Sequence, residues 1–418
     1  MEETRPILYG VADYAEIRKA NAWFIDRTTK IRDLEATRYA VFLRPRRFGK
    51  SMLTSILEAY YDVACADRFE ELFSGTDIGA NPTAERNSYL VLTLDFSAVD
   101  KSPELTEASF SSLVCGRINA FARKYAERIG KDSAERILAA NGSTDKMNAL
   151  FEETKGRDVG IYVIIDEYDN FTNTILAESG QAAYNALCHG DGFFKQFFTV
   201  LKALTTSLDA PLKRMFITGV SPVTMDDVTS GFNIGTNISL LPQYADFVGF
   251  RHEDLRAITD YYAAHCGFDA DKAYDTAIRW YDNYRFGSFD APPLANTTIV
   301  LSFFSYLWQT KQFPNELIDE NLRTDYAKIG SLIVKCGEPE RLIPYIKDVL
   351  LKESISARLV ADGQNIRGPW ELYSWFYYLG LLSISGAVFG NYLFSVPNMY
   401  ARTGLEKVLS YLEARLEE

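Results

Sequence analysis

Histidine and cysteine are scarce in this sequence and lie far apart. It has three histidines, and no two of its five cysteines form a C-x-x-C pair. Because these residues are the usual zinc ligands and zinc sites space them closely, the pattern argues against a zinc site. The amino terminus, MEETRPILYG, lacks the basic and then apolar pattern of a secretory signal, and no run of about 18 apolar residues predicts a membrane span. We therefore expect a cytoplasmic protein without a membrane partner.

Basic residues are outnumbered as well: 44 Lys and Arg stand against 56 Asp and Glu, for a net charge of −12. This balance argues against a protein whose main task is to coat nucleic acid, although it leaves room for a local basic patch. Hydrophobic residues make up 47% of the chain, which is ample for packed cores, and 418 residues predict more than one domain.

The segment Arg44–Asp62 follows an apolar run and predicts a loop that leads from a strand into a helix. Gly49–Ser51 supply the second half of the pattern G-x-x-x-x-G-K-[ST], whereas Arg44 stands where its first glycine is expected. In such a loop Lys50 can reach the β and γ phosphates of ATP, Ser51 can ligate Mg²⁺, and the helix presents its positive end. The alternative is a surface turn before a charged helix start.

Two arginines, Arg46 and Arg47, add positive charge to this loop. Phosphoryl transfer of this type typically uses a cation on the γ-phosphate beyond the loop lysine. The cation can come from these arginines, from Arg285 farther along the chain, or from a neighbouring subunit. The alternative is that Arg46 and Arg47 only pair with nearby carboxylates. We favour supply within the chain, and so expect a monomer or a weak homo-oligomer. The predicted nucleotide-binding residues of the loop are Arg46, Arg47, Phe48, Gly49, Lys50, Ser51 and Met52.

The segment VGIYVIIDEYDN, residues 159–170, predicts a central parallel strand. Its β-branched and aromatic residues end in two carboxylates, which is typical of a strand whose tip holds Mg²⁺ and a water molecule. Asp166 would hold the metal through water, and Glu167 would polarise the attacking water. The alternative is a core strand that ends in an aspartate without this role. Farther along, Met215–Ile217 predict a short strand with Thr218 at its tip.

Six strings follow one another along the chain: FIDRT, FLRPRRFGKS, IIDEYDN, HGDGFFKQFF, FITGVSPVTMDDVTSGFNI and WYDNYRFG. In this order they resemble the predicted AAA-ATPase-like family of bacteria and archaea, whose phosphate loop has the form RPRRFGK[ST]. The resemblance runs from about Tyr9 to Tyr400. It implies that Arg44 in place of the first glycine is usual in the family, and it predicts an ATP hydrolase that uses ATP and Mg²⁺.

The resemblance implies two further site residues. AAA-type ATPases have a polar residue at the strand end that senses the γ-phosphate; we choose Thr218, with Ser221 second, and the alternative is a hydroxyl that caps the next turn. The helices around WYDNYRFG look like the lid that follows an AAA-type core. Arg285 would then touch the γ-phosphate, or it would instead stack on Tyr281 or Phe286.

The last part of the chain, Pro369–Asn398, predicts an aromatic helix and two alternating strands, the outline of a winged helix. Such a unit binds DNA or packs on the ATPase, and the lack of a Lys/Arg-rich recognition helix favours packing. The final helix carries Leu405, Leu409, Leu412 and Leu416 on one face. We expect that face to be exposed for a missing or partner-supplied neighbour.

Together these patterns predict an α/β fold: an AAA-type P-loop NTPase with a parallel sheet and flanking helices, then a helical lid and a winged-helix-like unit. The predicted parts are a lead-in segment (1–36), the ATPase core (37–250), the lid (251–340) and the winged-helix-like unit (341–418). The predicted catalytic residues are Lys50, Asp166, Glu167 and Thr218, the metal ligands Ser51 and Asp166, and the lid residue on the nucleotide Arg285.

Two classes of function compete. In the first, ATP hydrolysis drives a conformational switch that controls an effector, such as a nuclease in a bacterial mobile-element or defence-type system. In the second, the protein is a nucleotide-binding regulator or scaffold with little or no hydrolysis. The presence of Glu167 favours the first, because a pure binder has no need of it. Many family members carry a PD-(D/E)xK-type nuclease domain, but no such pattern follows residue 300, so we expect no nuclease activity in this chain.

Overall fold

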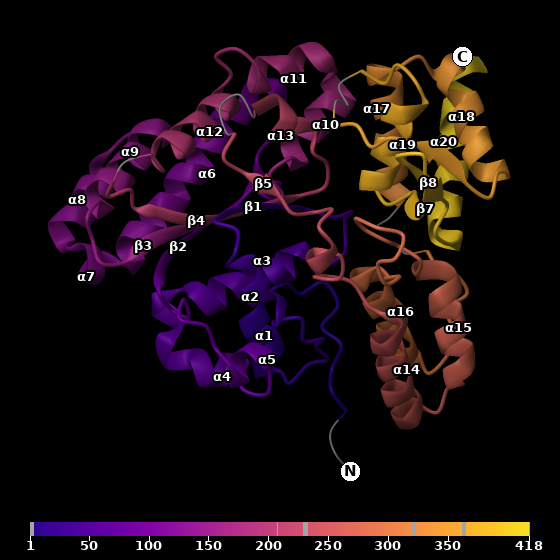
Figure 1. Cartoon of the computed structure of the whole chain (residues 1–418), viewed down its shortest axis with the longest axis horizontal. Coiled ribbons are helices and arrows are strands. Elements are labelled where there is room, and N and C mark those ends of the chain that lie inside the picture. The colour runs from indigo at the N-terminus through magenta and orange to yellow at the C-terminus, as the bar shows by residue number, and fades with distance from the viewer. Residues whose placement is uncertain (1–3, 207, 229–232, 319–322, 362–364, 418) are drawn as a thin grey trace. The chain divides into compact units, whose positions relative to one another are not determined.

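Figure 1 shows the computed structural model of the chain, which describes residues 4–206, 208–228, 233–318, 323–361 and 365–417. The chain divides into two compact units that do not follow the sequence order. The first, which we name the C-terminal unit, contains Met1–Lys30, Arg44–Leu53 and Ser239–Glu418. The second, the sheet unit, contains Ile31–Leu43 and Thr54–Ile238. The predicted phosphate loop is thus grouped with the C-terminal unit.

A parallel five-stranded sheet forms the centre of the sheet unit, with the strand order β2-β3-β4-β1-β5. The strands are β1 (Tyr39–Leu43), β2 (Tyr89–Asp95), β3 (Gly160–Asp166), β4 (Leu212–Gly219) and β5 (Thr236–Asn237). Every residue of β3 after Gly160 is buried, as expected for a strand covered on both faces. The strand expected within residues 159–170 is therefore confirmed as β3, and the run Met215–Ile217 lies inside the longer β4.

Helices cover both faces of this sheet. Figure 1 shows α6, α8, α9 and α12 on one side and α3, α4 and α5 on the other. The helices of this part of the chain are α2 (Lys30–Leu34) before β1, and then α3 (Lys50–Tyr61), α4 (Phe69–Phe73), α5 (Asp77–Ala80), α6 (Pro103–Lys124), α7 (Ala126–Ile129), α8 (Lys131–Ala139), α9 (Ser143–Thr154), α10 (Asn170–Ser179), α11 (Gln181–Cys188), α12 (Phe193–Ala203) and α13 (Val223–Val228). The longest of them, α6, ends at Lys124 with Tyr125 as its C-cap, and the short helix α7 follows directly.

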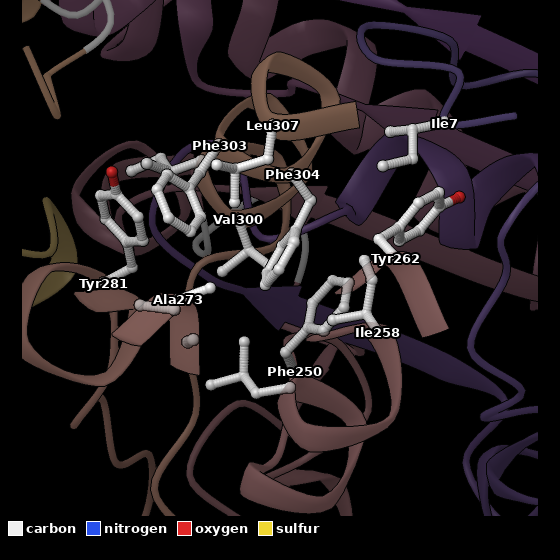
Figure 2. Close-up of a cluster of buried hydrophobic side chains, with 14 residues drawn as sticks. Ile7, Phe250, Ile258, Tyr262, Ala273, Tyr281, Val300, Phe303, Phe304 and Leu307 are labelled. Atoms are coloured by element: carbon white, nitrogen blue, oxygen red, sulfur yellow. The ribbon is translucent and has the colours of Figure 1, made fainter. Parts of the chain in front are cut away.

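The C-terminal unit is mostly helical. Its elements are α1 (Tyr14–Lys19), α14 (His252–Cys266), α15 (Ala270–Tyr281), α16 (Thr297–Thr310), α17 (Arg323–Cys336), α18 (Pro339–Leu351), β6 (Ile355–Ala357), α19 (Pro369–Tyr378), β7 (Ser383–Val388), β8 (Asn391–Ser395) and α20 (Met399–Glu417). Figure 2 shows the apolar cluster in which α14, α15 and α16 meet, with Phe304 of α16 near Ile258 of α14. This cluster holds α16 in place.

The antiparallel sheet β6-β8-β7 lies among α17, α18, α19 and α20 at the end of the chain. The prediction that the last helix, α20, exposes its leucine face is wrong. Leu405 and Leu412 are fully buried, because α20 packs on α17 and α18, and Leu416 is the exposed member of the set, at 43%. An amphipathic pattern predicts that one face of a helix is buried, but it does not show which element packs on that face.

In the described part of the chain, we find no helix that combines the length and apolarity needed to cross a membrane.

Candidate functional site

The predicted phosphate loop runs from Arg44 to Gly49, after β1 and before α3. Its backbone has positive φ at Arg47 (71°) and Gly49 (93°), and φ is not positive at Phe48 between them. Such alternation turns successive N–H groups toward one concave face, which is how backbone nests bind anions. Gly49 is needed because a residue with a Cβ resists this conformation.

Lys50 and Ser51 form the first turn of α3. The N–H of Leu53 donates to the Gly49 carbonyl at 3.0 Å, so the helical ladder begins just after the loop. The N–H groups before it have no acceptor within the helix and give its start a positive potential. The Lys50 ammonium is buried and donates to the Pro45 carbonyl at 3.3 Å. A buried ammonium, a hydroxyl and a backbone nest are the donor set that a nucleotide phosphate with Mg²⁺ requires.

Arg44 occupies the place of the first glycine, but its side chain belongs to the packing of the C-terminal unit. Its guanidinium donates to the carbonyls of Ser239 and Tyr244 at 2.8 Å and of Ala245 at 3.3 Å, and it lies over the Phe286 ring at 4.2 Å. The residue is 1% exposed, and burial lowers the pKa of its guanidinium to about 10, so it stays charged at neutral pH. Arg44 is therefore an anchor of the loop.

The side chain of Phe48 is a second anchor. It is fully buried, and its ring meets Tyr284 and Phe286 edge to face, with centroids 5.1 and 5.3 Å apart. Phe48 can thus serve a nucleotide only through its backbone. Arg46 and Arg47 are partly exposed, as is Met52.

Arg285, the expected lid residue, lies between Tyr284 and Phe286 in the sequence. Its backbone N–H donates to the Ser383 hydroxyl at 2.8 Å. Within the described ranges we find no hydrogen bond, ion pair or ring contact of its guanidinium. The predicted stacking alternative falls instead to Arg44, which covers Phe286.

Asp166 and Glu167 stand at the carboxyl end of β3, the end of the sheet at which β1 and β4 also terminate. The Asp166 carboxylate is buried and accepts the Glu167 N–H at 2.9 Å. Glu167 has a φ of 50°, which is uncommon outside glycine, and its carboxylate accepts from the Asn170 amide at 3.2 Å. The strand tip therefore holds two carboxylates in fixed orientations.

Thr218 lies in β4 between β3 and β1. It is fully buried, and its hydroxyl donates to the carbonyl of Phe42 at 2.8 Å. Phe42 is the residue of β1 that pairs with Thr218 in the sheet. This bond ties the sensor candidate to the strand that leads into the phosphate loop. Ser221, the second candidate, is also buried. Part of the motif that contains both residues, Thr229–Phe232, lies outside the described residues.

Sequence reasoning missed Asp169, the second aspartate of IIDEYDN. It is fully buried, and its carboxylate accepts from the backbone N–H groups of Val220 (3.1 Å) and Ser221 (2.8 Å) and from the Asn173 amide (2.7 Å). Asp169 thus joins the segment after β3 to the turn after β4. A buried strand end with a third acidic residue, three positions after Asp166, was the signal in the sequence.

Gly219 is fixed by this same contact. A Cβ at this position would lie 2.4 Å from the Asp169 carboxylate and 2.5 Å from the Tyr168 ring. The Tyr168 hydroxyl also donates to the Ser221 carbonyl. The glycine in ITGVSP is therefore required because two side chains of the β3 end pack directly on the backbone.

Comparison with known proteins gives a family match and a fold match. The family model described as Predicted AAA-ATPase matches residues 8–229, just over half of the 418 residues. No curated protein matches the chain.

Three archaeal structures resemble the chain along almost its whole length. The Walker-type ATPase PABY2304 of Pyrococcus abyssi has a TM-score of 0.51 at 11% identity, over 97% of this chain and 99% of its own. The Aeropyrum pernix ORC2 protein in ADPNP and ADP complexes has a TM-score of 0.41 at 12% identity, over 100% and 98%. The Cdc6p protein of Pyrobaculum aerophilum has a TM-score of 0.34 at 10% identity, over 93% of this chain and 94% of its own. The first of these shows a shared fold, the P-loop NTPase sheet with flanking helices.

Proposed function

Because the chain belongs to the predicted AAA-ATPase family, we propose that it binds ATP with Mg²⁺ and hydrolyses the ATP. One observation supports this most: β1 leads into a loop whose backbone forms an anion nest, and Lys50 and Ser51 follow at the start of α3. The same carboxyl edge of the sheet carries Asp166 and Glu167 at the end of β3. Few structural needs would place all of these groups after two strands that end at one edge.

The roles follow from the chemistry of each side chain. The backbone N–H groups of the loop and the Lys50 ammonium would hold the phosphates, because both donate to oxyanions. Ser51 and Asp166 supply the oxygen donors that Mg²⁺ prefers, and the ion when bound neutralises phosphate charge. Glu167 would orient and polarise the water. Thr218 would sense the γ-phosphate by donating its hydroxyl hydrogen to a phosphate oxygen in place of the Phe42 carbonyl.

Arginines would complete the charge on the γ-phosphate. Arg285 supports this role best, because its guanidinium has no partner within the described ranges and the residue is half-buried. Arg46 and Arg47 are the candidates in the loop, which makes a single chain competent. A monomer or weak homo-oligomer fits this supply within the chain.

The phosphate loop packs with residues of the C-terminal unit, through Arg44 and Phe48. We propose that hydrolysis shifts α14–α16 and the winged-helix-like region after them, and that this switch controls a protein effector such as a nuclease. That region carries no cluster of basic residues on α19, whose sequence is PWELYSWFYY, which favours packing over DNA binding.

A second candidate function is a nucleotide switch with slow hydrolysis. Two contacts favour it: the Glu167 carboxylate accepts from Asn170, and the Thr218 hydroxyl donates to the Phe42 carbonyl. Both expected catalytic side chains thus have structural partners, and a hydrolase would have to release or share them.

Binding and turnover of two variants separate these candidates. Lys50→Ala should weaken ATP binding roughly ten- to hundred-fold in calorimetry, because it removes a charge-assisted contact of about 1.5–3 kcal/mol. Lys131→Ala, at an exposed lysine of α8, is the control and should bind like the parent. Glu167→Gln should bind ATP and lose turnover if the protein is a hydrolase. If Lys50→Ala bound ATP with the affinity of the parent, the assignment of the phosphate loop as the ATP site would be wrong. If the parent and Glu167→Gln both hydrolysed ATP at the same near-zero rate, the nucleotide switch would be favoured.

A further inference from the structure

Besides the side-chain anchors Arg44 and Phe48, the backbone of the phosphate loop is bonded to one short segment, Asn296–Thr298, at the start of α16. The Asn296 amide donates to the Arg46 carbonyl at 3.1 Å, and the Thr297 hydroxyl donates to the Phe48 carbonyl at 3.0 Å. The carbonyl between them, that of Arg47, accepts the backbone N–H of Thr298 at 2.9 Å. Three successive carbonyls of the loop are therefore bonded to three successive residues of another element.

This bonding sets the direction of the loop's N–H groups. In a planar trans peptide the C=O and the following N–H point opposite ways, and the described residues contain no cis peptide. Fixing the carbonyls of residues 46–48 toward α16 therefore turns the N–H groups of residues 47–49 away from α16. These are the N–H groups of the nest formed by the positive φ angles at Arg47 and Gly49.

The segment that holds the loop is itself firmly supported. Asn296 caps α16, because its side-chain oxygen accepts the Ile299 N–H at 3.4 Å, and its own N–H donates to the Tyr281 carbonyl at 3.1 Å. The neighbouring Ala295 exchanges backbone hydrogen bonds with Phe250 at 2.7 and 3.0 Å. Behind it, α16 sends Val300, Phe303, Phe304 and Leu307 into the apolar cluster with α14 and α15 (Figure 2). A rigid base of this kind can impose a conformation on a loop.

We infer that Asn296 and Thr297 are positioning residues that orient the backbone of the phosphate loop for phosphate binding, and that they couple the loop to α16. The inference rests on the proposed function for the identity of the anion. It extends that function by assigning the orientation of the loop to residues about 250 positions away. Movement of the loop on loss of a phosphate would then pull on the first turn of α16 and reach α14 and α15 through the cluster.

The Thr297 hydroxyl gives the sharpest test. Thr297→Val keeps the branched shape and removes the donor to the Phe48 carbonyl, whereas Thr297→Ser restores a donor. Thr310→Val is the matched control, because it removes a hydroxyl at the other end of α16 that bonds the Tyr306 carbonyl within the helix and the backbone of Gln312 just after it. The readouts are the Kd of ATP by calorimetry, the melting temperature, and amide hydrogen exchange of peptides that cover residues 44–53 without nucleotide.

We expect Thr297→Val to raise the Kd of ATP about three- to tenfold, the effect of one lost hydrogen bond, and to speed exchange in the loop. Its melting temperature should match that of Thr310→Val, and Thr297→Ser should return both readouts toward the parent. Asn296→Ser is the second variant: serine still caps α16 but is too short to reach the Arg46 carbonyl, so it should change the readouts in the same direction.

Parental affinity and parental exchange in both Thr297→Val and Asn296→Ser would overturn the inference, while the loss of binding in Lys50→Ala would still support the proposed function. Exchange is measured without nucleotide, so it judges the orientation of the loop even if the parent binds no ATP and the proposed function fails. Equal changes in Thr310→Val would also overturn the inference, because a general loosening of α16 would then explain them.

Discussion

Substitution of Asp169 tests how the structure fixes the strand ends around the site. The carboxylate is fully buried and binds the N–H groups of Val220 and Ser221 and the amide of Asn173. In Asp169→Asn the oxygen that accepts from Ser221 and Asn173 can be kept, and it also lies 3.2 Å from the Val220 nitrogen. An NH₂ group then replaces the oxygen that lies 3.1 Å from the same nitrogen, so two donors face each other and the negative charge is lost. In Asp169→Ala both backbone N–H groups lose their acceptor.

The number of stranded donors sets the magnitude. A buried donor without an acceptor costs about 1–3 kcal/mol, so Asp169→Ala, which strands two backbone N–H groups, should lose about 2–6 kcal/mol of unfolding free energy. Asp169→Asn strands neither group but replaces charge-assisted bonds with weaker ones and sets an NH₂ group against the Val220 N–H, and should lose about 1–3 kcal/mol. For a unit of this size, roughly 2–4 °C is lost per kcal/mol. The asparagine variant should therefore melt about 2–12 °C below the parent, and the alanine variant lower still.

Calorimetric melting of the parent and both variants is the assay. Asp158→Ala is the matched control, because Asp158 is an exposed aspartate just before β3 and should change stability by no more than about 0.5 kcal/mol. The reasoning fails if both Asp169 variants melt with the control. It also fails if asparagine is as damaging as alanine, because the order of the two follows directly from the count of stranded N–H groups.

Two other substitutions test the loop. Arg44→Lys keeps the charge but cannot make the same fork of bonds to Ser239, Tyr244 and Ala245, so we expect a loss of roughly 2–3 kcal/mol in unfolding free energy, with Arg86→Lys at an exposed arginine over Phe69 as the near-neutral control. The Arg46→Ala, Arg47→Ala double variant should lose turnover by roughly 10³-fold if these arginines act on the γ-phosphate. Turnover per subunit should then stay level on dilution of the parent; a steep fall would point to an arginine from a second subunit.

Local sequence patterns predicted most strands of the parallel sheet and the identities of the candidate site residues. The β1 run, the GKS sequence and the IIDE strand can each be read within a dozen residues, because strand burial and helix starts leave a local signature. Partners far apart in sequence leave no such trace. Asp169 meets Val220 some 50 residues later, and Asn296 meets Arg46 some 250 residues earlier. The sequence shows that these residues are polar, but the topology decides what they bind.

Arg44 shows why the comparison of a loop with its consensus needs the backbone. The consensus glycine suggests a conformation that a Cβ would oppose, yet φ is not positive at Arg44, so that position makes no demand for glycine. The loop requires a positive φ at Gly49, which a glycine adopts readily, and at Arg47, where a residue with a Cβ adopts a φ of 71°. The three bonds from Asn296–Thr298 to the neighbouring carbonyls supply the restraint that a free arginine in this conformation would lack. In this chain the loop geometry is therefore imposed by α16 and the Arg44 anchor, and a glycine at residue 44 would remove an anchor without relieving any strain.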